Sequence, residues 1–141
     1  ASGDYIMFVD GDDWVDSDYV SYFVELVKGT ETLIGMSKNN YSVSKTVTAE
    51  KKYTVEAEKA IEWIYYDEIF VAVWNKIYSR KLLVDNKISF DSSIWFGEGM
   101  LFNIQCLQYV DTVAVGEKAV YHQTYNPNSA MRKFNLEYAK H

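Results

Sequence analysis

Hydrophobic and polar residues follow one another along the chain in blocks that predict an α/β fold. The apolar run Asp4–Val9 predicts a buried strand, and the acidic turn Asp10–Asp13 follows it directly. Apolar residues at helical spacing then predict a helix with one buried face. We expect Asp16 or Ser17 to cap this helix and Gly29 to end it.

The middle of the chain predicts two more strands, a helix and a strand that turns into a helix. Residues 32–36 and 43–53 flank a polar turn, which predicts a hairpin at an edge of the sheet. Thr54 is expected to cap the next helix. A short strand at Trp74–Tyr78 should turn at Ser79 into a short helix.

The last third predicts one longer helix and two short strands. Apolar residues recur at helical spacing from Glu98 to about Tyr109. Strands are expected at 112–115 and 119–123, and a polar tail from Asn126 is expected to be a loop before a last short helix.

Length and composition favour one folded domain, residues 1–141, because 48% of the residues are hydrophobic. The net charge of −6 disfavours nucleic acid as a partner, since phosphate binding needs clustered Lys and Arg. The single cysteine, Cys106, lies in an apolar segment and predicts a buried thiol in a reducing compartment. We therefore expect a cytoplasmic protein, at the inner face of the membrane if a longer chain carries an anchor.

The sharpest chemical feature is the acidic turn, in which Asp10, Asp12 and Asp13 stand close together around Gly11. Two carboxylates about 4 Å apart repel by about 4 kcal/mol at an effective dielectric constant of about 20. A divalent cation would relieve this repulsion, and carboxylate oxygens suit Mg²⁺ or Mn²⁺. A solvated turn that also caps the next helix is the structural alternative, and the turn alone does not separate the two.

Two enzyme families place an Asp-x-Asp motif directly after an apolar strand. Haloacid-dehalogenase-like phosphatases do so, but a Gly followed by Thr or Val usually comes after their second Asp. Asp13 and Trp14 stand there in this chain, so this phosphatase is the weaker enzyme alternative.

Four segments stand in order along nearly the whole chain: SGDYIMFVDGDDW, WNKIYSRKLL, FGEGMLFNIQCL and YHQTYNPNSAMRK. They resemble the second family, the family 2 glycosyltransferases of GT-A fold. The first segment matches that family's strand and Asp-x-Asp-Asp turn, and the later three resemble its middle segment, its Glu-Asp-x-x-Phe helix and the end of its domain. The ordered set is more specific than any one motif.

This resemblance implies a partial GT-A fold, a mixed sheet flanked by helices that lacks the N-terminal nucleotide-binding strands. It implies a transferase that moves a sugar from a nucleotide-diphosphate sugar to a hydroxyl of a glycan or other acceptor, with inversion, in cell-surface polysaccharide or glycan synthesis. As a fragment of such a catalytic domain, the chain alone is expected to be inactive.

The resemblance also implies roles for the residues of the acidic turn. Asp10, Asp12 and Trp14 would contact the nucleotide-sugar donor, and Asp12 and Asp13 would hold Mn²⁺ or Mg²⁺ directly or through water. The cation would bridge the two phosphates of the donor.

Glu98 is the implied general base, because it occupies the Glu of the family's Glu-Asp pair. Gly99 stands where the Asp is often found, and in many relatives that Asp is taken to be the base. A glutamate that only stabilises the start of a helix is the structural alternative.

Other residues have a plainer expected role. His122 lacks a His or Cys partner at metal-ligand spacing, which favours a structural role. Isolated basic residues are expected at the surface unless they meet a phosphate or an acidic acceptor; these are Lys76, Arg80 and Arg132. Some aromatic residues could stack on sugars, although core packing is commoner; these are Trp74, Trp95, Tyr65 and Tyr66.

A different class of function stays open, that of a noncatalytic binding or assembly fragment. Part of an α/β nucleotide fold would expose a sheet edge and apolar surface, which a homodimer would cover. Such a module has no need for clustered carboxylates after a buried strand, so the acidic turn favours the enzyme.

Overall fold

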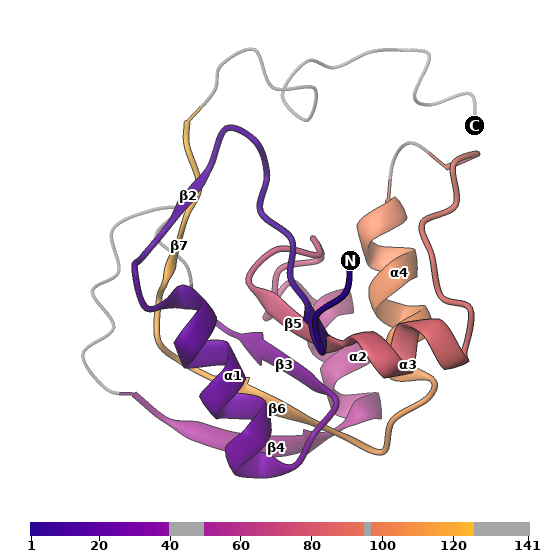
Figure 1. The fold of residues 1–141 in the computed structure, drawn as a ribbon, viewed down its shortest axis with the longest axis horizontal. Coiled ribbons are helices and arrows are strands. Elements are labelled where there is room, and N and C mark those ends of the chain that lie inside the picture. The colour runs from indigo at the N-terminus through magenta and orange to yellow at the C-terminus, as the bar shows by residue number, and fades with distance from the viewer. Residues whose placement is uncertain (40–49, 95–96, 126–141) are drawn as a thin grey trace.

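The computed structural model describes residues 1–39, 50–94 and 97–125. In these ranges the chain forms a five-stranded sheet, a separate two-stranded sheet and four helices (Figure 1). The elements are β1 (Tyr5–Ile6), β2 (Trp14–Val15), α1 (Tyr19–Thr30), β3 (Ile34–Ser37), β4 (Lys52–Glu56), α2 (Ala57–Tyr65), β5 (Lys76–Ser79), α3 (Arg80–Asp85), α4 (Glu98–Leu107), β6 (Thr112–Gly116) and β7 (Tyr121–His122).

The larger sheet has the strand order β1-β5-β3-β6-β4. Only β3 and β6 pair in parallel, and the other three pairs are antiparallel. It follows that β1, β3 and β6 run in one direction and β5 and β4 in the other. The carboxyl ends of β1, β3 and β6 therefore share one edge of the sheet with the start of β5.

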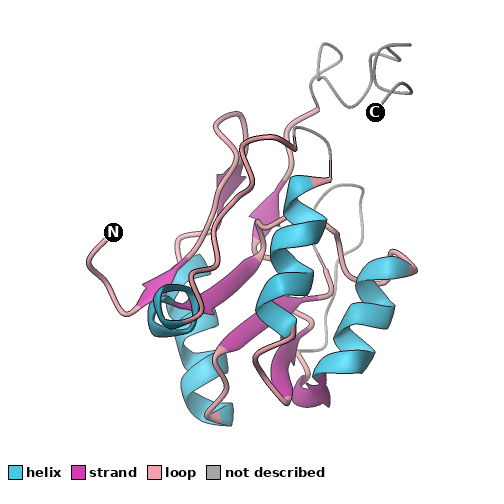
Figure 2. Cartoon of the chain, turned by 90° about the vertical axis from the view of Figure 1, so that its right-hand side faces the viewer, coloured by secondary structure: helices cyan, strands magenta, loops and turns pink. Residues whose placement is uncertain are grey.

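Both faces of the sheet are covered by helices, so its central strands are buried on both sides. Ile77 and Ala114 face a core built with α1, whereas Tyr78 and Val113 face a core built with α2, α3 and α4. This alternation is the period of two expected of a strand. Figure 1 shows α1 on one side of the strands and the other helices opposite, and Figure 2 views the side of these three helices.

Several sequence predictions are confirmed. The sheet is mixed and flanked by helices, and the predicted helix from Glu98 ends at Leu107. Ser79 ends β5 and caps α3, since its hydroxyl accepts a hydrogen bond from the Leu82 amide at 3.5 Å. Cys106 is fully buried.

The predicted ends of α1 are wrong. The helix begins after Asp18, not after Asp16 or Ser17, and no side chain caps it. The Asp18 carboxylate is instead paired with Lys118, and the Asp16 carboxylate bonds to His122. The two acidic side chains that could cap the helix are therefore paired with Lys118 and His122, which lie about a hundred residues later in the sequence.

The other end of α1 and the predicted hairpin also differ from expectation. Gly29 lies inside the helix, and Glu31 ends it in a left-handed conformation with φ of 55°. β3 and β4 form no hairpin, because β6 lies between them. Thr54 pairs with Ala114 inside β4, so it caps no helix, and α2 begins at Ala57.

Some predictions fall outside the described residues. They concern 43–49 of the predicted hairpin strand, Trp95, Arg132 and the tail from Asn126. Within the described ranges, no helix is both long enough and apolar enough to cross a membrane.

Candidate functional site

Sheet topology brings the acidic turn and Glu98 to the same edge of the molecule. The acidic turn follows β1 and so lies at the carboxyl ends of the parallel strands, where α/β sheets bind ligands. Helix α4 returns along the sheet into β6, so its first residue, Glu98, lies at this edge as well. Figure 1 shows the start of α4 and the β1–β2 connection at one end of the molecule.

The acidic turn is closed by a backbone bond and fixed by the segment that contains β7. The Asp13 amide donates to the Asp10 carbonyl at 3.1 Å. The buried Tyr121 hydroxyl accepts from the Asp10 amide at 3.1 Å and donates to Asp13 Oδ2 at 2.6 Å. The Thr124 amide donates to Asp13 Oδ1 at 2.8 Å. Asp13 therefore fixes the shape of the turn, whatever else it binds.

Asp10 and Asp12 are exposed, and their carboxylates accept no hydrogen bond from any other described residue. Partial burial of the Asp10 carboxylate raises its pKa, and the negative charges of Asp13, Asp12 and Glu98 raise it further. Glu98 is thus close enough to influence the acidic turn. The four carboxylates share one electrostatic environment that a bound cation would stabilise.

The donor set of the turn fits a hard divalent cation that keeps most of its water. Among the described residues, no three or more acidic, His or Cys side chains lie close enough together to enclose a metal ion. Mg²⁺ is usually bound by only one or two protein carboxylates, with water and substrate phosphates in its other positions. The exposed Asp12 and the adjacent Asp13 can supply that number.

Trp14 stands beside the turn and packs against His122. The two rings are stacked with centroids 3.5 Å apart and planes 7° from parallel, at paired positions of β2 and β7. His122 Nε2 lies 2.7 Å from Asp16 Oδ1, which fixes the imidazole. Trp14 is still 56% exposed, so its indole is available to a ligand.

A ladder of aromatic rings runs from the acidic turn to the loop before β5. Trp74 stacks on Tyr121 with centroids 4.4 Å apart, and Phe70 stacks on Trp74 at 4.6 Å. Trp74 is buried, as expected of a core residue, whereas Tyr65 and Tyr66 are exposed. Tyr121 is a site residue that the sequence does not reveal, because nothing local to it indicates that its hydroxyl reaches the acidic turn.

The expectation that Lys76 lies at the surface is wrong. Its side chain is buried, and Nζ donates to the carbonyl oxygens of Phe70 and Ala72, both at 2.6 Å. Burial lowers the pKa of Lys76 to about 7. Arg80 is half-buried, and its Nε donates to the Ala1 carbonyl at 3.0 Å.

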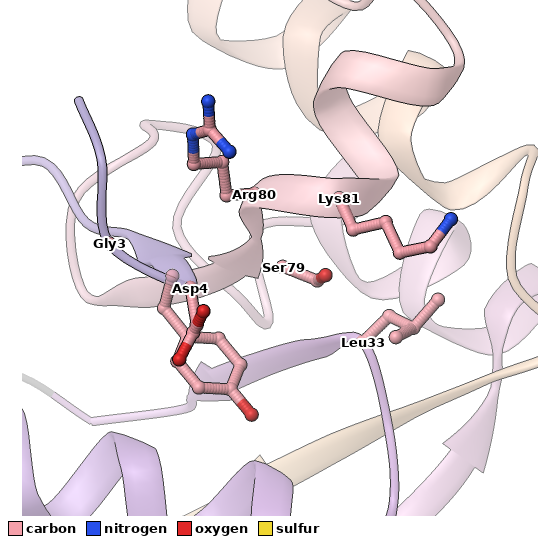
Figure 3. A pocket seen from close by; sticks show the side chains of 7 residues that line it. Gly3, Asp4, Leu33, Ser79, Arg80 and Lys81 are labelled. Atoms are coloured by element: carbon pink, nitrogen blue, oxygen red, sulfur yellow. The ribbon is translucent and has the colours of Figure 1, made fainter.

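Two hollows in the described surface lie away from the acidic turn. One, shown in Figure 3, lies where β1 and β3 begin and β5 ends, and is lined by residues that include Asp4, Leu33 and Arg80. This is the sheet edge opposite the acidic turn. The other lies between the loop after α3 and the last turns of α4, lined by residues that include Asp91 and Gln105.

Comparison with known proteins finds relatives named as glycosyltransferases. The chain is 22% identical to EpsH and 27% identical to EpsJ, both of Bacillus subtilis (strain 168) and both named glycosyltransferases. The alignments cover 95% and 92% of this chain but 41% and 40% of the relatives, so the chain spans about two fifths of their length. No family model matches the sequence.

Solved structures of S. aureus TarS have the same fold over most of this chain. TarS 1-349 in complex with UDP-GlcNAc matches with a TM-score of 0.74 at 23% identity, over 96% of this chain and 39% of that one. The complex with UDP matches with a TM-score of 0.69 at 24% identity, over 90% and 37%. These likenesses confirm the predicted α/β fold. The prediction of a glycosyltransferase is supported by the names of EpsH and EpsJ.

Proposed function

We propose that this chain is the metal-binding and acceptor-side part of a family 2 glycosyltransferase of GT-A type. The proposed reaction moves a sugar from a nucleotide-diphosphate sugar to a hydroxyl of a glycan acceptor, in the synthesis of a cell-surface polysaccharide. The observation that carries the proposal is the meeting of the acidic turn and Glu98 at the carboxyl edge of the sheet. The relatives named glycosyltransferases and the likeness to TarS bound to UDP-GlcNAc support it.

In this proposal the acidic turn binds the phosphate end of the donor. Asp12 and Asp13 hold Mn²⁺ or Mg²⁺, which offsets negative charge on the diphosphate leaving group. Asp10 lies beside the ribose or the sugar, and the exposed indole of Trp14 forms a wall of the donor site. The hydrogen bonds from Tyr121 and Thr124 to Asp13 keep the turn in one shape before the donor arrives.

On the acceptor side, Glu98 takes the proton from the attacking hydroxyl. The hydroxyl oxygen then forms a bond to the anomeric carbon while the bond from that carbon to the diphosphate breaks, which inverts the configuration. Glu98 is exposed at the first position of α4, where the helix dipole favours a carboxylate. An exposed base can reach an acceptor that arrives from solvent.

The metal assignment predicts that Mn²⁺ binds weakly to the isolated chain and that Asp12→Asn weakens binding by about tenfold or more. Asp12 is the sharper test, because its carboxylate accepts no hydrogen bond from the described residues. Asp13→Asn should also weaken binding, but it removes the acceptor of the Tyr121 and Thr124 bonds and so should lower stability as well. Calorimetric titration with MnCl₂ measures the affinity, and thermal unfolding measures the stability.

Asp85→Asn is the matched control, since it removes an exposed carboxylate from α3. It should bind Mn²⁺ like the wild type. Equal Mn²⁺ affinity in the wild type and the Asp12 and Asp13 variants would remove the metal assignment.

The transferase assignment is tested with two proteins. One is the isolated chain. The other, called here the extended protein, is this chain joined to the segments of its relatives that lie outside the aligned region. We expect UDP-sugar turnover with Mn²⁺ from the extended protein and none from the isolated chain. Product detection by mass spectrometry, with a panel of UDP-sugars and oligosaccharide acceptors, measures it. An extended protein that binds no nucleotide sugar would contradict the transferase assignment. Turnover by the isolated chain would contradict the proposal that this chain holds only the metal-binding and acceptor side of the active site.

A further inference from the structure

The loop formed by residues 70–73, called here the 70–73 loop, is held by side chains rather than by its own backbone. Among the described residues, no backbone–backbone hydrogen bond involves residues 70–73. Lys76 Nζ donates to the carbonyls of Phe70 and Ala72, both at 2.6 Å. Asn103 Nδ2 donates to the carbonyls of Val71, at 2.7 Å, and Ala72, at 3.3 Å. Lys76 and Asn103 therefore hold three successive carbonyls, and the Tyr78 hydroxyl lies 3.3 Å from the next one, the carbonyl of Val73.

The environment of Lys76 suits it to hold the carbonyls of the 70–73 loop. It is 1% exposed, and it forms no ion pair with any residue in the described part of the chain. A lysine buried without a carboxylate partner is uncommon because desolvation disfavours its charge. A neutral amine still has two N–H groups, one for each carbonyl that Lys76 contacts.

The amide of Asn103 is oriented by a third residue. The Tyr78 hydroxyl donates to Asn103 Oδ1 at 2.6 Å, which directs Asn103 Nδ2 toward the loop. Tyr78 and Asn103 are both fully buried. A buried, fully paired network of this kind has one well-defined arrangement.

The 70–73 loop packs directly on the first turn of α4. A Cβ added to Gly99 would lie 3.5 Å from Ala72 Cα and 3.6 Å from the Val71 oxygen, so loop backbone and helix backbone are in contact there. Asn103 follows Gly99 by four residues and therefore lies on the same face of α4. Glu98, the first residue of α4, is next to this contact.

The same loop is connected to the acidic turn on its other side. Phe70 stacks on Trp74, which stacks on Tyr121, and the Tyr121 hydroxyl bonds to both ends of the turn. The loop thus contacts the helix that begins with Glu98 and is linked by stacked rings to Asp13.

We infer that Lys76 is a positioning residue, which with Asn103 fixes the 70–73 loop against α4 and so sets where Glu98 stands relative to the acidic turn. The inference rests on the proposed function for the role of Glu98 as base. The hydrogen bonds and contacts of the loop do not depend on that role, so the two can fail separately.

The first test is ¹⁵N relaxation and amide exchange on the isolated chain carrying Lys76→Met, which keeps an unbranched apolar stem and removes the donors. In the wild type we expect order parameters of about 0.85 in the 70–73 loop, and in the variant values below about 0.6. Exchange of the Leu101 and Phe102 amides, in the first turns of α4, should accelerate about tenfold. Asn103→Leu should have the same local effect.

Val113→Ala is the control for general destabilisation, since it removes buried methyl groups from β6. It should accelerate exchange broadly and leave the loop order parameters unchanged. If Lys76→Met does not fold, Asn103→Leu replaces it, because it removes the donor to the Val71 and Ala72 carbonyls and leaves Lys76 in place. A rigid 70–73 loop in Lys76→Met, or in Asn103→Leu if that is used, overturns the inference.

The second test uses steady-state kinetics of the extended protein. Lys76→Met should lower kcat about tenfold and change the donor KM by less than about twofold, because the base is misplaced while donor contacts persist. A loosened loop with unchanged kcat overturns the positioning role. A wild-type extended protein without transferase activity would instead contradict the proposed function, and the relaxation data would still decide whether Lys76 holds the loop.

Discussion

Glu98→Gln in the extended protein is expected to lower kcat by about 10²-fold or more while the donor KM changes by less than about twofold. The amide keeps the size and the hydrogen-bonding reach of the side chain but cannot accept a proton. Donor binding is proposed to depend on the acidic turn, which this change leaves intact. Steady-state kinetics with saturating acceptor, together with donor affinity by calorimetry, separates the two effects.

Glu58→Gln is the matched control for Glu98→Gln, because Glu58 is also an exposed glutamate in the first turn of a helix, α2. It should leave turnover unchanged. Gly99→Asp is an informative companion, since a Cβ at Gly99 meets its neighbours at ordinary contact distances of 3.5–3.6 Å. Near-normal turnover in Glu98→Gln, or a large gain in Gly99→Asp, would show that Glu98 is not the base.

The stability of the isolated chain is expected to rise between pH 7 and pH 8.5 because of Lys76. Burial lowers the pKa of Lys76 from 10.5 to about 7. Between these values the unfolded chain binds a proton that the folded chain lacks, so the free energy of unfolding increases with pH by about 1.4 kcal/mol per unit. Below pH 7 the amine is protonated in both states, and its contribution no longer changes. Urea unfolding at half-unit steps of pH measures the slope.

The window must end near pH 8.5, because other buried groups act in the opposite direction above it. Burial raises the pKa of Cys106 to about 12 and that of Tyr22 to about 12, so the folded chain keeps protons that the unfolded chain loses. Lys76→Met should abolish the rise, whereas Lys81→Met, at an exposed lysine of α3, should retain it. A wild-type free energy of unfolding that stays flat from pH 7 to pH 8.5 would show that Lys76 titrates normally.

The features that the sequence predicts well are those written in a few neighbouring residues. The serine at position 79 and the helical spacing after Glu98 each indicate their own local structure. The buried strand predicted over Asp4–Val9 is wrong in extent and burial, because β1 covers only Tyr5–Ile6, is half-buried, and is followed by the exposed Val9. Strand direction brings the acidic turn and Glu98 to one edge of the sheet. The acidic turn is visible in the sequence itself, whereas Glu98 is indicated only by the resemblance to a glycosyltransferase family.

The features that the sequence does not predict depend on partners far along the chain. Asp18 does not cap α1 with its side chain because Lys118, a hundred residues later, pairs with it. β3 and β4 do not form a hairpin because β6 pairs with both. Lys76 looks like a surface residue until the carbonyls of the preceding loop surround its amine. The local sequence pattern predicts helices and strands. The ion pair, the strand pairing and the hydrogen bonds described here are known only from the folded structure.

The way the 70–73 loop is held has a consequence for how such a protein can evolve. The bonds from Lys76 and Asn103 end on carbonyl oxygens, which every amino acid carries. Mutations within the loop leave these oxygens in place, so the bonds that fix its backbone do not depend on which side chains the loop carries. Mutations at the two donor positions have no such freedom, because no change elsewhere in the loop replaces a lost donor. These bonds therefore constrain the sequence at positions 76 and 103 more than within the loop.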